Sequence, residues 1–315
     1  MCTAIVYRNG HTYFGRNLDL ERGYGECVVI TPRHFPLPFR YGLTSTSHYA
    51  MIGMAAVRDG YPLYFEATNE VGLSMAGLNF PGNADYQPLC PDKENITPFE
   101  FLPWLLGNCA NLAQVRQRLS QISLVNAPFS PSLPLSPLHW LISDQDSSIV
   151  VEPLEGGLAV YDNPFEVLTN NPPFPYHRIH ASNYMSLSVG PAPSRFASSI
   201  PMVNYSLGMG ALGLPGDFSS SSRFVKALFV KENAVSDGTE AANVCQFFHI
   251  LQTVAMPKGC VLTENGFEYT RYSSCCNAQR GIYSYTTYDQ STITSLDLHA
   301  IDLEETRLFS FPISV

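Results

Sequence analysis

The chain opens with MCTAIVYRNGHTYFGRNLD (residues 1–19), and this stretch decides the fold because it predicts the first two strands. Thr3, Ile5 and Tyr7 alternate with Cys2, Ala4 and Val6 in the first half, and Asn9-Gly10 after them is the strongest short signal for a β-hairpin. The return strand is predicted from His11 to Arg16. It brings the run from Phe14 to Asp19 back beside Cys2, so the sequence predicts that these residues form one cluster.

Cys2 directly follows the initiator methionine and is small enough for methionine aminopeptidase to expose. Removal of Met1 would leave one residue that carries both a thiol and a free α-amino group. The ordinary pKa values of these groups are about 8.5 and about 7.7–8.0, so proton exchange between them near neutral pH costs little. An N-terminal threonine activated by its own amine follows the same logic. Position 2 therefore suggests a nucleophile that is its own base, and the alternative is a structural cysteine.

Two charged residues of the return strand are candidates to support this nucleophile. An arginine close to a thiol favours the thiolate, which suggests a role for Arg16. A carboxylate at Asp19 could hold the ammonium group of residue 2 and set its orientation. The alternative is a surface salt bridge between Arg16 and Asp19, which would contribute little.

Two asparagines are candidate hydrogen-bond donors. Asn79 and Asn170 each end a predicted strand, and a proline follows two residues later. Side-chain amide donors of this kind build oxyanion holes, although an asparagine before proline also commonly makes a turn. Arg223 follows a Gly/Pro-rich turn at the start of a predicted helix. Because a cation is unfavourable at a helix N-terminus, we expect Arg223 to have an anionic or carbonyl partner.

The order of predicted elements is strands, helices, strands, helices, strands, with no βαβ alternation and no internal repeat. Such blocks favour an α+β layered domain over a doubly wound parallel sheet. A capping box at Thr97–Glu100 and a cap at Asn111 begin the first two helices. Further helices are expected over 176–187, 223–234 and 239–254. Residues 188–222 are rich in Gly, Pro and Ser and read as a long excursion.

Composition limits the possible partners. The net charge of -9 over 315 residues argues against a nucleic-acid partner. No secretory signal opens the chain and no apolar run is long enough for a membrane span, so we expect a cytoplasmic protein. The eight cysteines form no CxxC pair and no Cys/His cluster with zinc spacing, which predicts that most of them are free buried thiols and that there is no metal and no cofactor.

Together, these fragments resemble the choloylglycine hydrolase family, the bile salt hydrolases and penicillin V acylases among the N-terminal nucleophile hydrolases. The resemblance covers nearly the whole chain and rests on these stretches: Met1–Thr3, Phe14–Asp19, Asn69–Leu73, Ala76–Pro81, Leu138–Trp140, Leu168–Pro172, Gly213–Arg223, Phe247–Leu251 and Tyr285–Tyr288. It implies a four-layer αββα sandwich of two mostly antiparallel sheets flanked by helices, in a single domain over residues 1–315. It also implies a homotetramer that uses the excursion at about 188–222.

The resemblance places the functional residues on Cys2, Arg16, Asp19, Asn79, Asn170 and Arg223. It implies that the Cys2 thiolate attacks the amide of a glycine- or taurine-conjugated bile acid and forms a thioester that water hydrolyses. In this scheme Arg16 supports the thiolate and Asp19 orients the ammonium group. Asn79, with Asn170 or a backbone N–H, holds the oxyanion, and Arg223 supports the charge of the network.

A steroid acyl group needs an apolar cleft. In relatives, loops at corresponding places shape the pocket, and the candidates here are Leu18, Leu20, Tyr64, Phe65, Leu133 and Leu135. We expect Tyr64 and Phe65 to come from the second of these loops. The alternative for each of the six is ordinary core or loop packing.

Two other functions stay open. The same chemistry could act on penicillin V or on an N-acyl-homoserine lactone. Penicillin V acylases tend to carry Tyr where bile salt hydrolases carry Asn, so Asn79 favours the bile salt reading. The second alternative is a non-catalytic protein that binds bile acids or lipids, but such a protein has no need of a free N-terminal cysteine.

Overall fold

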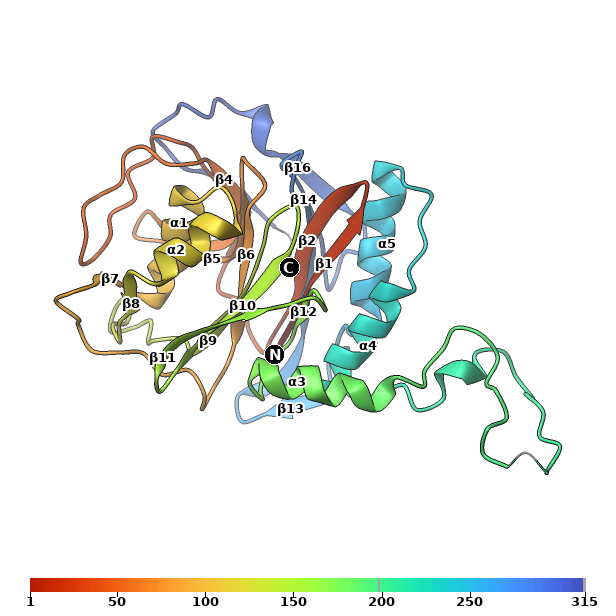
Figure 1. Cartoon of the computed structure of the whole chain (residues 1–315). Coiled ribbons are helices and arrows are strands. Elements are labelled where there is room, and N and C mark those ends of the chain that lie inside the picture. Colours follow the sequence, from red (N-terminus) through yellow and green to blue (C-terminus); the bar gives the residue numbers. More distant parts are fainter. Residues whose placement is uncertain (198, 314–315) are drawn as a thin grey trace.

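Two stacked β-sheets with helices on both outer faces make up the body of the protein (Figure 1). The structure is a computed structural model, and it describes residues 1–197 and 199–313. Every strand pair in the two large sheets is antiparallel within the described residues. The predicted four-layer αββα arrangement is confirmed.

The strands of the two sheets come from distant parts of the chain. The first sheet has the order β12 (Val167–Leu168), β1 (Cys2–Asn9), β2 (His11–Leu20), β14 (Gly266–Asn277), β15 (Ile282–Thr287), β16 (Thr294–Asp297), with β13 (Val261–Thr263) paired to β14. The second has the order β11 (Gly157–Asp162), β10 (Ser148–Leu154), β9 (Leu138–Ser143), β6 (Ser74–Asn79), β5 (Tyr61–Asn69), β4 (Met51–Arg58), β3 (Glu26–Thr31), β17 (Phe309–Pro312).

Helices cover each sheet on its outer face. The second sheet is covered by α1 (Pro98–Asn108) and α2 (Leu112–Leu119), and the first by α4 (Ser220–Glu232) and α5 (Glu240–Gln252) (Figure 1). The predicted capping box at Thr97 and the predicted cap at Asn111 are both confirmed. A short parallel pair, β7 (Glu94–Ile96) and β8 (Ile122–Leu124), lies beside the α1 and α2 layer.

The hairpin of β1 and β2 is confirmed, and its register builds the site. Cys2 lies opposite Leu18, and Ala4 lies opposite Arg16. Cross-strand partners point to the same face, so the three residues Cys2, Arg16 and Leu18 share one face of the sheet. Glycine is required at position 15, because a Cβ there would lie 2.0 Å from the carbonyl oxygen of Ser274 on β14.

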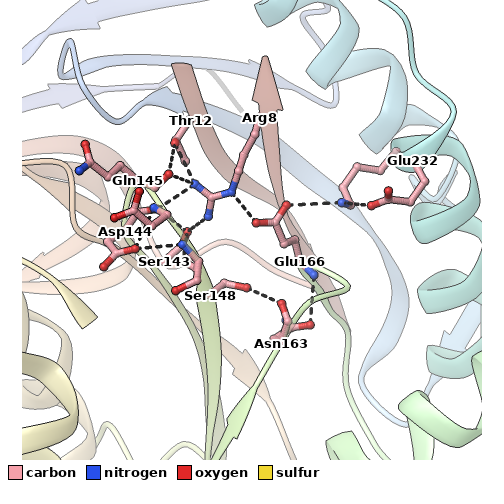
Figure 2. Close-up of polar contacts among 12 residues, drawn as sticks. Arg8, Thr12, Ser143, Asp144, Gln145, Ser148, Asn163, Glu166 and Glu232 are labelled. Atoms are coloured by element: carbon pink, nitrogen blue, oxygen red, sulfur yellow. Dashed lines mark hydrogen bonds and ion pairs between the residues drawn. The ribbon is translucent and has the colours of Figure 1, made fainter. Parts of the chain in front are cut away.

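At the opposite end of β1, an arginine ties the two sheets together (Figure 2). The guanidinium of Arg8 donates to the side chains of Thr12 and Glu166 in the first sheet layer, and to Ser143 at the end of β9. It also donates to the backbone carbonyl of Asp144. Charge-assisted bonds of this kind hold the end of the sandwich that lies far from Cys2.

A helix and an extended segment leave the body at one corner (Figure 1). The helix predicted over 176–187 is shorter, as α3 (Phe174–Ala181) followed by a 3₁₀ turn over Ser182–Tyr184. The excursion predicted over 188–222 leaves the body and ends where α4 begins, at Ser220. Residue 198 of this excursion lies outside the described residues, and so do residues 314 and 315 of the predicted domain. None of the helices in the described ranges is long and apolar enough to cross a membrane.

Candidate active site

Cys2 is the first residue of β1 and is buried, with 2% of its surface exposed. Its backbone nitrogen donates to Oδ1 of Asn170, at 2.8 Å. Asn170 follows β12, which pairs with β1 through Ala4 and Leu168. The pairing of these two strands therefore carries an asparagine from the middle of the chain to the nitrogen of residue 2.

Arg223 joins this pair from the first turn of α4. Its Nη1 donates to the carbonyl oxygen of Cys2 at 2.5 Å and to Oγ1 of Thr3 at 2.6 Å. Its Nη2 donates to Oδ1 of Asn170 at 2.8 Å, and its Nε donates to the carbonyl oxygen of Phe218. The expected carbonyl partner of Arg223 is confirmed, and these bonds offset the unfavourable position of a cation at a helix N-terminus.

Asn170 has most of its bonding capacity occupied by protein groups. Oδ1 accepts from Cys2 and Arg223, and Nδ2 donates to the carbonyl oxygen of Asn79 at 2.7 Å. Its backbone N–H donates to Oγ of Ser220, and its carbonyl oxygen lies 3.0 Å from Nε2 of His177. The side chain is thus fixed as a link between the Cys2 nitrogen and the end of β6.

Asn79 ends β6 and is half-buried. Among the described residues, no hydrogen bond to its side-chain amide is seen, in contrast to Asn170. An amide that is held by its backbone and has a free N–H can donate to another group.

Asp19 lies beside the start of the chain. Its backbone N–H donates to the carbonyl oxygen of Met1, and its backbone oxygen accepts from the Met1 amino group at 3.0 Å. The amino group also pairs with Glu268. One carboxylate oxygen of Asp19 accepts from Thr270, at 2.6 Å, and the other is buried without a hydrogen-bond partner. Asp19 therefore has a free acceptor in a region that holds the amino end of the chain.

Arg16 is fully buried between the two sheets. Its Nη1 donates to the carbonyl oxygens of Phe65 and Gly77 on the second sheet, at 3.1 and 2.5 Å. Its Nη2 is buried without a hydrogen-bond partner. The guanidinium is thus anchored on one side and keeps a free donor on the other.

The buried charges of the site act on one another. Burial raises the pKa of the Asp19 carboxyl, while the positive charge of Arg223, the amino group and Arg16 and the bond from Thr270 lower it. Burial lowers the pKa of Arg223, which the charges of Asp19 and Cys2 oppose. Burial also lowers the pKa of the Met1 amino group below its ordinary value. A buried amine of this kind gives up its proton more readily than an exposed one.

Hydrogen bonds join four of the six predicted catalytic positions: Cys2, Asn79, Asn170 and Arg223. Asp19 bonds to the Met1 amino group, and the charges of Arg223 and Arg16 act on its carboxyl. Arg16 is next to them through its position on β2, opposite Ala4. The described residues contain no group of three or more His, Cys, Asp or Glu side chains placed to hold a metal ion.

The six predicted pocket residues lie in different places. Leu18, Leu20 and Phe65 pack in the core cluster that contains Cys2. Tyr64 and Phe65 lie within β5, so assigning them to a loop was wrong. Tyr64 makes a 2.7 Å hydrogen bond to Thr31 and packs, like Leu135, in a cluster on the helix-covered side of the second sheet. Leu133 is half-buried in the loop before β9.

Sequence reasoning missed several residues that hold the site. They are Thr3, Glu66, His177, Ser220 and Thr270. No chemistry in the sequence singles out any of these five residues, and all except His177 have partners that are distant in the sequence. Thr270, for example, is 251 residues from Asp19.

The profile of the linear amide C–N hydrolases, choloylglycine hydrolase family, matches residues 2–311. The chain belongs to this family. It is therefore an amidohydrolase that acts on linear amides, and the resemblance seen in the sequence is confirmed. The chain is similar to the bile salt hydrolase/transferase of Lactiplantibacillus plantarum, with 51% identity over 99% of this chain and 97% of the relative.

Other relatives carry related names. The conjugated bile acid hydrolase of Lactobacillus gasseri is 41% identical over 90% of this chain and 91% of its own length. The solved structure of the C2A mutant of the conjugated bile acid hydrolase from Clostridium perfringens has a TM-score of 0.92, with 32% identity, and covers 100% of this chain and 97% of that one. A penicillin V acylase from Agrobacterium tumefaciens shares the fold, with a TM-score of 0.76 and 19% identity, covering 98% of this chain and 90% of that one.

Proposed function

We propose that this protein hydrolyses the amide bond of glycine- and taurine-conjugated bile acids, with Cys2 as the nucleophile after removal of Met1. The observation that carries the proposal is the bond from the Cys2 nitrogen to Asn170, in a chain whose relatives are named bile salt hydrolases. The nitrogen that bonds Asn170 becomes the α-amino group when Met1 is removed.

The contacts suggest a role for each residue. Asn170 and the free oxygen of Asp19 accept from the α-amino group of Cys2 and fix its direction. Arg223 fixes the Cys2 carbonyl, so the main chain of the nucleophile is held from both sides. The buried charge of Arg16, whose Nη2 has no hydrogen-bond partner, acts on Cys2 and would stabilise the thiolate. Because Asn170 donates its Nδ2 to Asn79, we assign the oxyanion to the side chain of Asn79 rather than to that of Asn170.

The reaction then has two steps. The Cys2 thiol gives its proton to its own amine, and the sulfur attacks the amide carbonyl carbon to form a tetrahedral oxyanion beside Asn79. The C–N bond breaks, the ammonium returns its proton to the departing glycine or taurine nitrogen, and a bile acid thioester remains on Cys2. Water then attacks the thioester, with the amine as base, and releases the free bile acid and the thiol.

The test is release of free glycine and taurine from glycocholate and taurocholate by the purified protein. We expect release that Cys2→Ser abolishes and that Cys245→Ser, a change at an exposed cysteine, leaves unaltered. No release of either amine from either conjugate, by protein that has lost Met1, would contradict the substrate assignment.

The same chemistry on another acyl group is the second candidate. Penicillin V and N-acyl-homoserine lactones are the substrates to compare, because the penicillin V acylase neighbour shares the fold. The asparagine at position 79, rather than tyrosine, favours the bile acid conjugate. A kcat/KM for penicillin V above that for both bile acid conjugates would make penicillin V the better candidate substrate.

We also propose a homotetramer assembled through the excursion, in the cytoplasm. The excursion carries apolar side chains that the single chain leaves exposed, including Phe196 at 94% and Leu207 at 100%. An apolar surface of this kind is a poor one to leave in water. Light scattering should give four chains for the full-length protein and fewer for Phe196→Ser with Leu207→Ser, whereas a monomer would contradict the proposal. The free state of all eight cysteines fits a reducing compartment.

A further inference from the structure

A buried carboxylate lies next to Arg16, in the core between the sheets. Glu66 on β5 has 1% of its surface exposed, and its Oε2 lies 3.9 Å from Nε of Arg16. The hydroxyl of Tyr272 donates to Oε2 at 2.7 Å, and that of Tyr283 donates to Oε1 at 2.5 Å. A charged carboxylate in the protein interior is costly without partners, and Glu66 has one cation and two hydroxyls around it.

Glu66 is the acidic partner of Arg16. The hydrogen bonds of the Arg16 guanidinium go to neutral backbone carbonyls, at Phe65 and Gly77 among others. Within the described residues, the one carboxylate at ion-pair distance from Arg16 is that of Glu66. Phe65 and Glu66 are neighbours on β5, so one strand supplies both a carbonyl and a counter-charge to the guanidinium.

The buried charges around Cys2 balance. Arg16 and Arg223 are the cations and Asp19 and Glu66 are the anions, and each is at most 1% exposed. Charges in a protein interior act on one another more strongly than in water. Loss of the Glu66 charge would leave Arg16 uncompensated beside the thiol and would make the thiolate easier to form.

We propose that Glu66 is a positioning residue for the nucleophile, which fixes the Arg16 guanidinium and limits the positive charge that Arg16 presents to Cys2. This inference rests on the proposed role of Cys2. Burial raises the pKa of Glu66 above its ordinary value, but the charge of Arg16 and the hydroxyls of Tyr283 and Tyr272 oppose that rise. The charged and titratable groups around the Glu66, Arg16 and Cys2 set are Asp19, Arg223, Tyr272, Cys276, Tyr283 and the amino end of the chain.

The test measures alkylation of Cys2 by iodoacetamide as a function of pH, followed by peptide mass spectrometry, which needs no substrate. In Glu66→Gln, we expect the midpoint of this pH profile to move to lower pH by about half a unit or more, because one compensating anion is lost. Glu100→Gln is the matched control, since Glu100 is equally buried but lies in the capping box of α1. Its midpoint should equal that of the unaltered protein.

An unchanged midpoint in Glu66→Gln would overturn the inference, as would an equal shift in Glu100→Gln. If Glu66→Gln does not fold, Tyr272→Phe takes its place, because loss of the hydroxyl on Oε2 makes Glu66 easier to neutralise and should move the midpoint in the same direction. The two proposals fail in different ways. Absence of pH-dependent alkylation at Cys2 in the unaltered protein would contradict the nucleophile itself, whereas a normal profile that Glu66→Gln and Tyr272→Phe leave unchanged contradicts the role of Glu66 alone.

Discussion

The side-chain oxygen of Asn170 lies 2.8 Å from the backbone nitrogen of Cys2, across 168 residues of sequence. In the unprocessed chain this nitrogen is an amide that donates one hydrogen. After loss of Met1 it is an amine, and the same oxygen is placed to accept from it. The site thus has an acceptor for the amine in position before maturation, a form of preorganisation that favours catalysis.

Replacing Asn170 by Ala should lower kcat/KM for the preferred conjugate by about 100-fold, because the Cys2 amine loses the group that directs it. Ser220→Ala, which removes a bond to the Asn170 backbone and a bond to the Thr169 hydroxyl but leaves the Asn170 side chain in place, should have a smaller effect. Steady-state kinetics of both variants checks this. An Asn170→Ala enzyme with normal kcat/KM would contradict the role of Asn170.

Arg223→Lys should lower the free energy of unfolding by about 3 kcal/mol, although the charge is kept. Arg223 donates from three nitrogens to groups on three segments, and a lysine has one nitrogen, so buried acceptors would lose their partners. Urea unfolding measures the loss. Arg116→Lys is the control, because its ion pair with Asp162 is exposed, and its effect should be within error.

Gly15→Ala should destabilise the protein by about 2 kcal/mol or more, since the added Cβ would meet the backbone of Ser274 at 2.0 Å. Strand β2 would have to move away from β14, and Arg16 would move with it, so we expect activity to fall as well. Gly156→Ala, where a Cβ meets nothing within 4 Å, is the comparison for thermal melting. Equal melting temperatures for the two variants would show that β2 and β14 do not need this close approach.

Stability should fall in acid partly because of His177. Burial lowers its pKa to about 4, against an ordinary value of 6.5, although its bond to the carbonyl of Asn170 opposes the shift. The unfolded chain binds this proton first as the pH falls, so the contribution is complete above pH 6.5 and is lost progressively between pH 6.5 and 4. The loss for this group amounts to about 3 kcal/mol.

His177→Gln should be less sensitive to acid over that range, because glutamine can donate to Asn170 without titrating. Urea unfolding at pH 7.0, 5.5 and 4.5 for both proteins measures the difference. Parallel loss of stability in the two proteins would rule out His177 as a source of the acid sensitivity.

Local signals in the sequence predict local structure well. Asn9-Gly10 predicts the hairpin, and Thr97 and Asn111 predict the helix starts, because each depends only on neighbouring residues. The helix predicted to Leu187 ends earlier, since only Phe174 and His177 of α3 are buried and little packing extends it. The spacing of Leu112, Val115, Leu119 and Ile122 predicts one apolar helix face, but Ile122 lies in β8, because a three-residue strand is too short to show a period of its own.

The sequence predicts which residues form the site, but not the hydrogen bonds between them. The hairpin brings Arg16 and Asp19 to Cys2 by local geometry, whereas Asn170 and Arg223 were candidates from a strand end and a helix start, and only the resemblance placed them in the same site. Their bonds depend on the pairing of β12 with β1 and on the packing of α4, and these are contacts between segments far apart in the sequence. The bond from Asn170 to Asn79, which moves Asn170 from the oxyanion to the amine in our assignment, has no signal in the sequence.

The most direct test of the account is the intact mass of the active enzyme, read together with amine release from glycocholate and taurocholate. If Cys2 is the N-terminal nucleophile, the active enzyme has a mass lower by one methionine residue, and any fraction that retains Met1 is inactive. An enzyme that retains Met1 and releases glycine or taurine at the full rate would contradict this role, because Cys2 would then have no free amine to accept its proton.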